Sequence, residues 1–379
     1  MNKYAKSFGI FGITFLTFFS SAFLSNLKIA KAENKSLNIK KSIFSRKENM
    51  NEIEIIMQVN NINIGGTLTI PPQQRINSLV IMSSGSGPQD RDETLDGFKI
   101  FKEIAKHLST QGIATFRYDD RGVGESTGDF TNSTLQDHSE DLKEIMNFFK
   151  SHKKYQFKDF ILFGHSQGGI VTANVAAENQ DVKKIVLMGA PSVPLIEVVL
   201  YQVRQEYIST NLDKALIEAE VSAHNRLMRA IKDNNKLDKA LKTFKESSKS
   251  ILSKLKPNEP NAKIEKMATN KTNEFEIVYA LPSLTSFLYY DPSNDYERLQ
   301  LPVLGLFGGK DLQVTIEQNK DRMENALLKS QINFHFVTFD DANHYFQKAK
   351  TGQREEYGTL DKKFVDGFLE EISTWILNN

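Results

Sequence analysis

A ten-residue stretch near the middle of the chain constrains its fold more than any other. The apolar residues 160–163 stop at Gly164, and small and apolar residues follow Ser166. A short apolar run that leads into a run of small residues predicts a buried strand turning into a closely packed helix. Residues 164–168 fit the pattern G-x-S-x-G, in which a strained turn holds the serine hydroxyl above the end of the strand. We therefore predict that Ser166 is a nucleophile.

Strand-like and helix-like segments alternate on both sides of this turn. A predicted hairpin over residues 52–70 is followed by alternation through residue 191, and the alternation resumes over residues 294–379. This pattern predicts an α/β fold with a mostly parallel central sheet, helices on its faces and functional loops at one edge, with 51–191 and 294–379 as its core. Residues 192–293 do not continue this alternation and instead contain long, charged, amphipathic stretches. This pattern predicts a helical cap insertion covering that edge.

A serine hydroxyl needs a base to take its proton, and the base needs an acid to orient it. His344 follows the last strand-like run, whereas the other histidines lie in predicted elements or beside the turn. Asp311 follows the preceding strand-like run at the same edge, and the chain order serine, aspartate, histidine is the one this kind of turn uses. Asp340 and Asp341 are rivals by proximity, but a residue three or four positions before His344 in a tight loop is poorly placed to contact it. We predict Ser166, Asp311 and His344 as the catalytic residues.

Stabilising an oxyanion requires two backbone N–H donors. We expect the first from Gln167, next to the nucleophile, and the second from the loop after the third predicted strand. Ser86 is the first choice there and Gly87 the alternative. The charged residues 90–92 would either contact substrate or form ion pairs with one another that rigidify the loop, and those at 119–125 are predicted to fix their own loop.

These motifs resemble the α/β-hydrolase superfamily, and within it the cap-bearing serine hydrolases grouped with carboxylesterases and serine aminopeptidase-like lipases. The resemblance runs from about Asn51 to the C-terminus and is carried by residues 85–92, 120–126 and 164–169. It implies a Ser-His-Asp hydrolase without cofactor or metal, and a helical cap between the sixth strand and the strand that carries the acid. Ser84 departs from the pattern, because many relatives have the histidine of a His-Gly pair there.

The N-terminal 32 residues have the order of a Sec-type signal peptide. Lysines precede an apolar run over residues 8–24, and small residues follow at Ala30 and Ala32. We expect cleavage after Ala32 and a secreted, periplasmic or cell-surface protein without a stable membrane span, with an uncleaved anchor helix as the alternative. Residues 33–50 are polar and aperiodic, which predicts a disordered linker.

The composition limits the partners of the chain. The formal net charge is +1, and clusters of lysine such as residues 236–256 are interrupted by acidic and apolar residues. These features are typical of solvated helix faces and exclude a nucleic-acid partner. The chain contains no cysteine, so it forms no disulfide. The sequence indicates no oligomeric state.

We predict an exported serine esterase that cleaves small-molecule carboxylic esters with small to medium acyl groups through an acyl-enzyme. The alternative is a serine aminopeptidase acting on short peptides, which would need an acidic group such as Glu197, Glu206 or Glu218 to bind the free amine. A thioesterase acting on coenzyme A esters is disfavoured by export. From a different class, the chain could be an inactive binding protein on the same fold, but the complete set of three catalytic residues argues against it.

Overall fold

The computed structural model describes residues 51–208 and 210–378. The predicted signal peptide (1–32) and linker (33–50) lie outside the described residues. The described chain divides into a sheet unit, residues 51–195 and 286–378, and a helical unit, residues 196–285. The helical unit is shorter at both ends than the predicted insertion of 192–293. Within the described residues we find no helix with the length and hydropathy needed to cross a bilayer.

The sheet unit contains an eight-stranded sheet with the order β1-β2-β6-β3-β7-β8-β9-β10. β1, β2 and β6 pair antiparallel in turn, and every pair from β6 to β10 is parallel. The strands are β1 (Asn51–Val59), β2 (Ile62–Ile70), β3 (Ser78–Ser83), β6 (Ala114–Tyr118), β7 (Asp159–His165), β8 (Val182–Met188), β9 (Val303–Gly308) and β10 (Phe334–Phe339). The predicted mostly parallel α/β sheet is confirmed.

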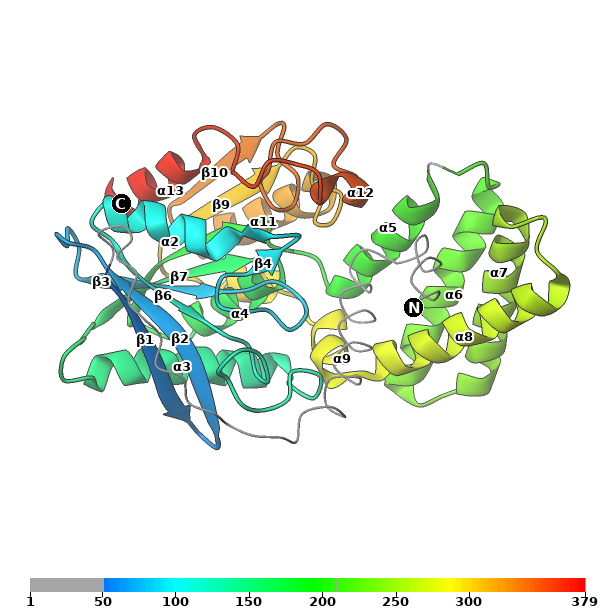
Figure 1. Ribbon diagram of the computed structural model, residues 1–379, viewed down its shortest axis with the longest axis horizontal. Coiled ribbons are helices and arrows are strands. Elements are labelled where there is room, and N and C mark those ends of the chain that lie inside the picture. Colours follow the sequence, from blue (N-terminus) through cyan, green and yellow to red (C-terminus); the bar gives the residue numbers. More distant parts are fainter. Residues whose placement is uncertain (1–50, 209, 379) are drawn as a thin grey trace, which may run out of the picture. The chain divides into compact units, whose positions relative to one another are not determined.

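Helices cover both faces of this sheet. α2 and α13 pack together on one face, and α3 lies on the other, where it packs against α4 (Figure 1). The helices of this unit are α2 (Ile100–Thr110), α3 (Leu135–Ser151), α4 (Gln167–Ala176), α10 (Ser293–Tyr296), α11 (Ile316–Ser330), α12 (Arg354–Tyr357) and α13 (Phe368–Asn378). α4 starts directly after Ser166 and is buried along almost its whole length, so the turn that carries the serine is anchored at the centre of the core.

Because β3, β6, β7, β8, β9 and β10 run parallel, their carboxyl ends meet at one edge of the sheet. Ser166 follows β7, Asp311 follows β9 and His344 follows β10. The loop with Ser86 and Gly87 follows β3 at the same edge. A short hairpin of β4 (Thr94–Leu95) and β5 (Phe98–Lys99), which the sequence pattern did not predict, extends this loop toward α2.

The helical unit is built from α5 (Leu195–Ile208), α6 (Lys214–Asp233), α7 (Leu237–Leu255), α8 (Asn261–Ala280) and the start of α9 (Pro282–Leu288). α8 was not predicted: it begins directly after Pro260, a residue that suits a helix start because its missing N–H would have no helical partner. Each of α6, α7 and α8 buries an apolar stripe, as amphipathic helices in a small bundle do.

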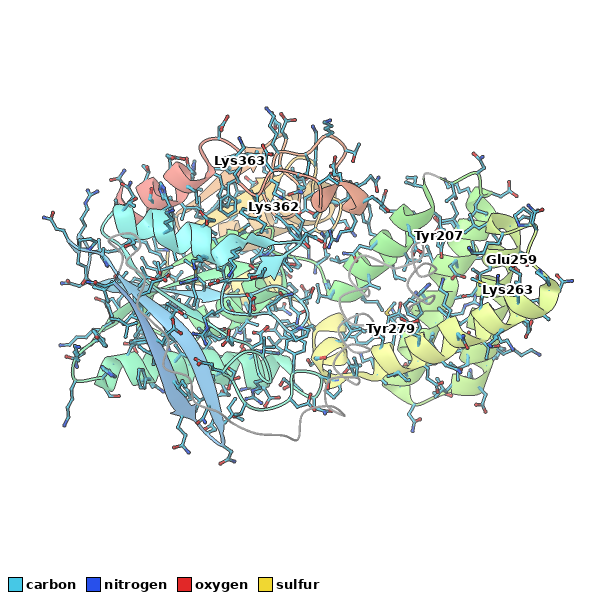
Figure 2. All side chains as sticks on the ribbon, in the orientation of Figure 1. Tyr207, Glu259, Lys263, Tyr279, Lys362 and Lys363 are labelled. Atoms are coloured by element: carbon cyan, nitrogen blue, oxygen red, sulfur yellow. The ribbon has the colours of Figure 1, made fainter. Side chains whose placement is uncertain are left out.

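Charged groups are also buried inside the helical unit. Lys271 Nζ lies 2.8 Å from Glu220 Oε1 and 3.1 Å from the hydroxyl of Tyr207, and His224 Nδ1 lies 2.6 Å from the hydroxyl of Tyr279. Glu220 and His224 are fully buried, and Tyr207 and Tyr279 are labelled in Figure 2. Such a cluster is stable only while its charges stay paired, because an uncompensated buried charge is costly.

Candidate active site

Ser166 lies in the strained turn that the sequence predicted. Its backbone has φ 51° and ψ −122°, a conformation that residues with a Cβ rarely adopt. The turn is too tight for side chains at the flanking glycines: a Cβ at Gly164 would lie 2.5 Å from Gly168 O, and one at Gly168 would lie 2.1 Å from Ser83 O. The Ser166 N–H donates to Met188 O at 2.9 Å, which ties the turn to the end of β8.

Asp311 and His344 come together at the same edge. His344 Nδ1 lies 2.7 Å from Asp311 Oδ2, and both side chains are buried. Asp311 Oδ1 accepts the N–H groups of Gln313 at 2.8 Å and Val314 at 2.9 Å, so the carboxylate is fixed on both oxygens. The imidazole is therefore held by an oriented acid through Nδ1, which leaves Nε2 available for proton transfer.

The two rival aspartates have other surroundings. Asp340 and Asp341 are both exposed, and Asp341 forms an ion pair with Lys310 at 2.7 Å. This ion pair lowers the pKa of the Asp341 carboxyl. Among the three candidate acids, Asp311 is the one in contact with the histidine.

The serine turn lies beside His344. The ring of His165 is 4.8 Å from the ring of His344, centroid to centroid. A Cβ at Gly189, which follows β8, would lie 3.3 Å from His344 Nδ1 and 3.4 Å from Asp311 Oδ2. Among the hydrogen bonds of residues 51–208 and 210–378, His344 bonds through Nδ1 to Asp311, and none joins its Nε2 to Ser166 Oγ.

The loop after β3 supplies the candidate oxyanion donors. A Cβ at Gly85 would lie 3.3 Å from Ser166 Cβ, so this loop passes directly against the serine. The Gly85 N–H donates to Glu93 Oε1 at 2.7 Å and is therefore occupied. The N–H groups of Ser86, Gly87 and Gln167 have no acceptor among residues 51–208 and 210–378. These are the three donors that the sequence predicted, and their role in catalysis stays a prediction.

Asp120 anchors this loop from the end of β6. Its carboxyl oxygens accept the Ser84 hydroxyl at 3.2 Å and the Gln89 N–H at 2.9 Å. Burial raises the pKa of Asp120 to about 8. Ser84 thus holds the loop in place through its side chain.

Arg91 and Asp92 form ion pairs with other segments, whereas Asp90 Oδ1 accepts the N–H groups of Asp92 at 3.0 Å and Thr94 at 3.1 Å within its own loop. Arg91 pairs with Asp119 at 2.6 Å and also contacts Glu54 and Glu125. Asp92 pairs with Arg117 of β6 and with Lys99. The predicted ion pairing of residues 90–92 with one another is therefore wrong, because Arg91 and Asp92 pair with other segments. A contact of these residues with substrate stays a prediction.

The predicted loop-fixing role of residues 119–125 is also supported. Arg121 binds the Asp141 carboxylate through two nitrogens, at 2.6 and 2.8 Å, and contacts Asp137 at 3.1 Å. Both carboxylates belong to α3, so the loop after β6 is tied to this helix.

Sequence reasoning missed Glu93. Its side chain is fully buried, and Oε1 lies 2.8 Å from His165 Nδ1. The other ring nitrogen of His165, Nε2, lies 3.0 Å from His344 O. Burial alone would lower the pKa of His165, but the Glu93 carboxylate and the His344 carbonyl outweigh burial and raise it. Glu93 follows the ion-paired run 90–92 directly, yet no sequence pattern indicates that its partner lies 72 residues away.

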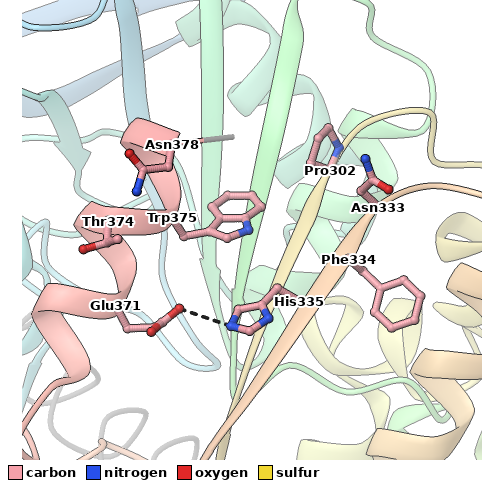
Figure 3. Close-up of a pocket in the computed structure, with 8 residues that line it drawn as sticks. All are labelled: Pro302, Asn333, Phe334, His335, Glu371, Thr374, Trp375 and Asn378. Atoms are coloured by element: carbon pink, nitrogen blue, oxygen red, sulfur yellow. Dashed lines mark ion pairs between the residues drawn. The ribbon is translucent and has the colours of Figure 1, made fainter.

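A separate surface hollow lies at the opposite edge of the sheet. It has a volume of about 290 Å³, and Glu371 contacts His335 at 3.3 Å beside it (Figure 3). Its lining residues are Pro302, Asn333, Phe334, His335, Glu371, Thr374, Trp375 and Asn378. Several of them stand at the amino ends of β9 and β10, so this hollow is not part of the site around Ser166.

Comparison with known proteins connects this geometry to a family. Residues 96–346 match the family model described as serine aminopeptidase, S33. The match includes Ser166, Asp311 and His344 and begins after the loop with Ser86. The chain is also 28% identical over 319 residues to esterase EstD of Thermotoga maritima, which covers 82% of this chain and 65% of EstD. The chain thus spans slightly less than two thirds of that relative.

Solved structures share the fold at low sequence identity. An esterase from Pyrococcus furiosus is 14% identical with a TM-score of 0.51, covering 91% of this chain and 96% of the esterase. A proline iminopeptidase from Mycobacterium smegmatis is 11% identical with a TM-score of 0.50, covering 86% of this chain and 97% of that protein. From the family match and the sheet topology together, the chain belongs to the serine aminopeptidase (S33) family of α/β-hydrolase-fold proteins.

Proposed function

We propose that the protein hydrolyses carboxylic esters with Ser166 as the nucleophile. His344 takes the proton of the Ser166 hydroxyl as the oxygen attacks the ester carbonyl, and Asp311 stabilises the imidazolium that forms. The alcohol leaves with the proton from His344, and a water activated by His344 then hydrolyses the acyl-enzyme. The observation that carries this proposal is the 2.7 Å contact of His344 with Asp311 next to a serine in a strained turn.

Two backbone N–H groups would hold the oxyanion that forms during the attack. Gln167 lies at the start of α4, where the helix dipole also favours negative charge. The second donor is Ser86, with Gly87 as the alternative, because the N–H of Gly85 already donates to Glu93. Losing one such donor typically slows catalysis by about 10²- to 10³-fold.

Ester substrates are proposed from the similarity to EstD, whose name describes an esterase. The family description names aminopeptidases as well, which keeps short peptides as a second candidate. A peptidase would need a carboxylate that is free to bind the substrate amine. Glu218 is bound by Arg204 at 2.5 and 2.8 Å, whereas Glu206 Oε2 is buried without a partner among the described residues. Comparing p-nitrophenyl ester with aminoacyl-naphthylamide hydrolysis separates the two activities.

We also propose export, on the basis of the N-terminal sequence alone. Mass spectrometry of the protein secreted from cells that express the full chain should find a new N-terminus at Glu33. An N-terminus at Met1 in a membrane-bound protein would instead support the uncleaved anchor.

The experiment that tests the proposed function is labelling with a fluorophosphonate probe together with ester hydrolysis. Wild-type protein should label at Ser166 and hydrolyse p-nitrophenyl butyrate. Ser166→Ala should keep the fold and lose both activities, with kcat reduced by several orders of magnitude, roughly 10⁴-fold or more.

Ser373→Ala is a matched control for this test. Ser373 is another buried serine, and its hydroxyl lies 3.0 Å from His107 Nε2, outside the candidate site. This variant should label and turn over like wild type. A folded wild-type protein that neither labels nor hydrolyses any ester would favour the inactive binding protein.

A further inference from the structure

A buried charged pair connects three segments of the candidate site. Glu93 is fully buried and His165 is 1% exposed. Glu93 Oε1 accepts the N–H of Gly85 at 2.7 Å, on the loop with the candidate oxyanion donors, and lies 2.8 Å from His165 Nδ1. His165 precedes the nucleophile and reaches the backbone carbonyl of His344 at 3.0 Å through Nε2. The pair therefore contacts the oxyanion loop, the serine turn and the loop of the base.

The hydrogen-bonding partners define the protonation of His165. A carbonyl oxygen only accepts hydrogen bonds, so Nε2 must carry a proton to bond to His344 O. While Glu93 is a carboxylate it also only accepts, so Nδ1 must carry the second proton and both bonds form on a His165 imidazolium. The other arrangement that forms both bonds has a protonated Glu93 donating to Nδ1 of a neutral ring. Glu93 Oε1 also accepts the N–H of Gly85 at 2.7 Å, which favours the carboxylate and the imidazolium.

Stability of the core alone does not explain why a charged pair is buried here. Replacing a buried ion pair by apolar residues of similar volume is often neutral or stabilising. Glu93 also has φ 47°, an uncommon conformation for a residue with a Cβ. A charged pair kept at this place suggests a role in geometry, because backbone strain tends to concentrate at functional sites.

Resting on the proposed function, we propose that Glu93 and His165 are a positioning pair for the reaction. The charge on the pair keeps both His165 hydrogen bonds intact. These bonds fix the positions of the loop with Ser86 and the loop with His344 relative to Ser166. Neither residue contacts the reacting atoms, so the pair acts through the placement of Ser86 and His344.

Glu93→Gln separates charge from shape. The amide oxygen of glutamine can take the place of Oε1, and its nitrogen can take the place of Oε2, which has no partner among the described residues. The substitution thus keeps an acceptor for Gly85 and removes the charge that holds His165 doubly protonated. The ring then has one N–H, and one of its two bonds is lost.

Glu371→Gln is the matched control. It makes the same substitution in another Glu–His pair, in which Glu371 Oε1 lies 3.3 Å from His335 Nε2 in the separate hollow, outside the candidate site. Glu93→Gln should lower kcat for p-nitrophenyl butyrate by about tenfold or more with KM within about threefold, while Glu371→Gln stays within about twofold of wild type. His165→Gln should lower kcat to a similar extent as Glu93→Gln. The double variant should have about the same kcat as each single variant, because paired residues act as one unit.

A kcat for Glu93→Gln within about twofold of wild type, with Ser166 labelling unchanged, would overturn the proposal. A second measurement uses wild-type protein and so does not depend on the variants folding. NMR of protein labelled with ¹⁵N-histidine should show protons on both ring nitrogens of His165 at neutral pH, and a single protonated nitrogen there overturns the proposal whatever the activity.

The labelling of wild-type protein separates this proposal from the proposed function. Absence of Ser166 labelling and ester hydrolysis in folded wild-type protein rejects the proposed function and, with it, a positioning role in that reaction. Normal wild-type activity with an unaffected Glu93→Gln variant rejects the positioning pair alone.

Discussion

Replacing Asp311 by asparagine tests how His344 is oriented. In the wild-type protein Oδ1 accepts two backbone N–H groups, from Gln313 and Val314, and Oδ2 accepts the proton of His344 Nδ1. Asparagine offers one oxygen and one NH₂ group. With its NH₂ toward the two backbone donors, it would leave two buried donors unpaired at a cost of about 1–3 kcal/mol each. The oxygen should therefore stay on the backbone side, and the NH₂ should face His344.

An NH₂ group facing Nδ1 reverses the tautomer of His344. Nδ1 must accept, so the ring proton moves to Nε2, and Nε2 can no longer take the proton of Ser166. The expected loss in kcat/KM is about 10³- to 10⁴-fold, which corresponds to about 4 to 5.5 kcal/mol of transition-state stabilisation. The melting temperature should change little, because both backbone hydrogen bonds are kept.

The assay is initial-rate hydrolysis of p-nitrophenyl butyrate, with thermal unfolding measured on the same preparations. Asp341→Asn is the control, since Asp341 is an exposed aspartate that pairs with Lys310 in the same group of loops. It should stay within about twofold of wild type. A folded Asp311→Asn protein with more than about a tenth of wild-type activity would refute this reasoning.

Three further predictions concern the turn, the loop anchor and the helical unit. Gly168→Ala places a Cβ 2.1 Å from Ser83 O, so fluorophosphonate labelling should fail and the free energy of unfolding should fall by about 1–3 kcal/mol; labelling at the wild-type rate would contradict this. Burial raises the pKa of Asp120 from 3.8 to about 8, so the stability that its proton provides is complete below about pH 4 and is lost as the pH rises to 8. Denaturant unfolding of Asp120→Asn should therefore show a flatter pH dependence across this window, and a profile parallel to that of wild type would count against the shift. Lys271→Met removes the lysine that pairs with the buried carboxylate of Glu220 and should lower the unfolding free energy by about 3–5 kcal/mol in urea titrations. Lys263→Met removes a solvent-accessible ion pair between the start of α8 and Glu259, which precedes the helix; both residues are labelled in Figure 2. It should cost less than about 1 kcal/mol, and equal losses in the two variants would reject the argument.

The sequence was sufficient to predict the parts of the fold that follow from periodicity and chain order. Alternating strands and helices predicted a parallel sheet, and parallel strands place their following loops at one edge, so the proximity of Asp311 and His344 followed from topology. The strained turn at Ser166 could be predicted because its close approaches exclude every side chain at Gly164 and Gly168.

The parts that escaped prediction depend on side-chain contacts over long sequence distances. Glu93 pairs with His165, and Asp92 with Arg117, but a buried glutamate in a charged loop has the same sequence appearance as an exposed one. α8 escaped prediction because a proline such as Pro260 can end one helix or precede the next, and here it precedes α8. The identity of the second oxyanion donor depends on which N–H the Glu93 carboxylate occupies, which no sequence pattern shows.

The most direct test of the account is the mass of the intact protein after reaction with a fluorophosphonate. Wild-type protein should gain one adduct, located at Ser166 by peptide mapping, at a rate that falls sharply in His344→Gln. An unmodified Ser166 in folded protein, or an equal labelling rate without His344, would contradict the claim that these residues form one catalytic unit.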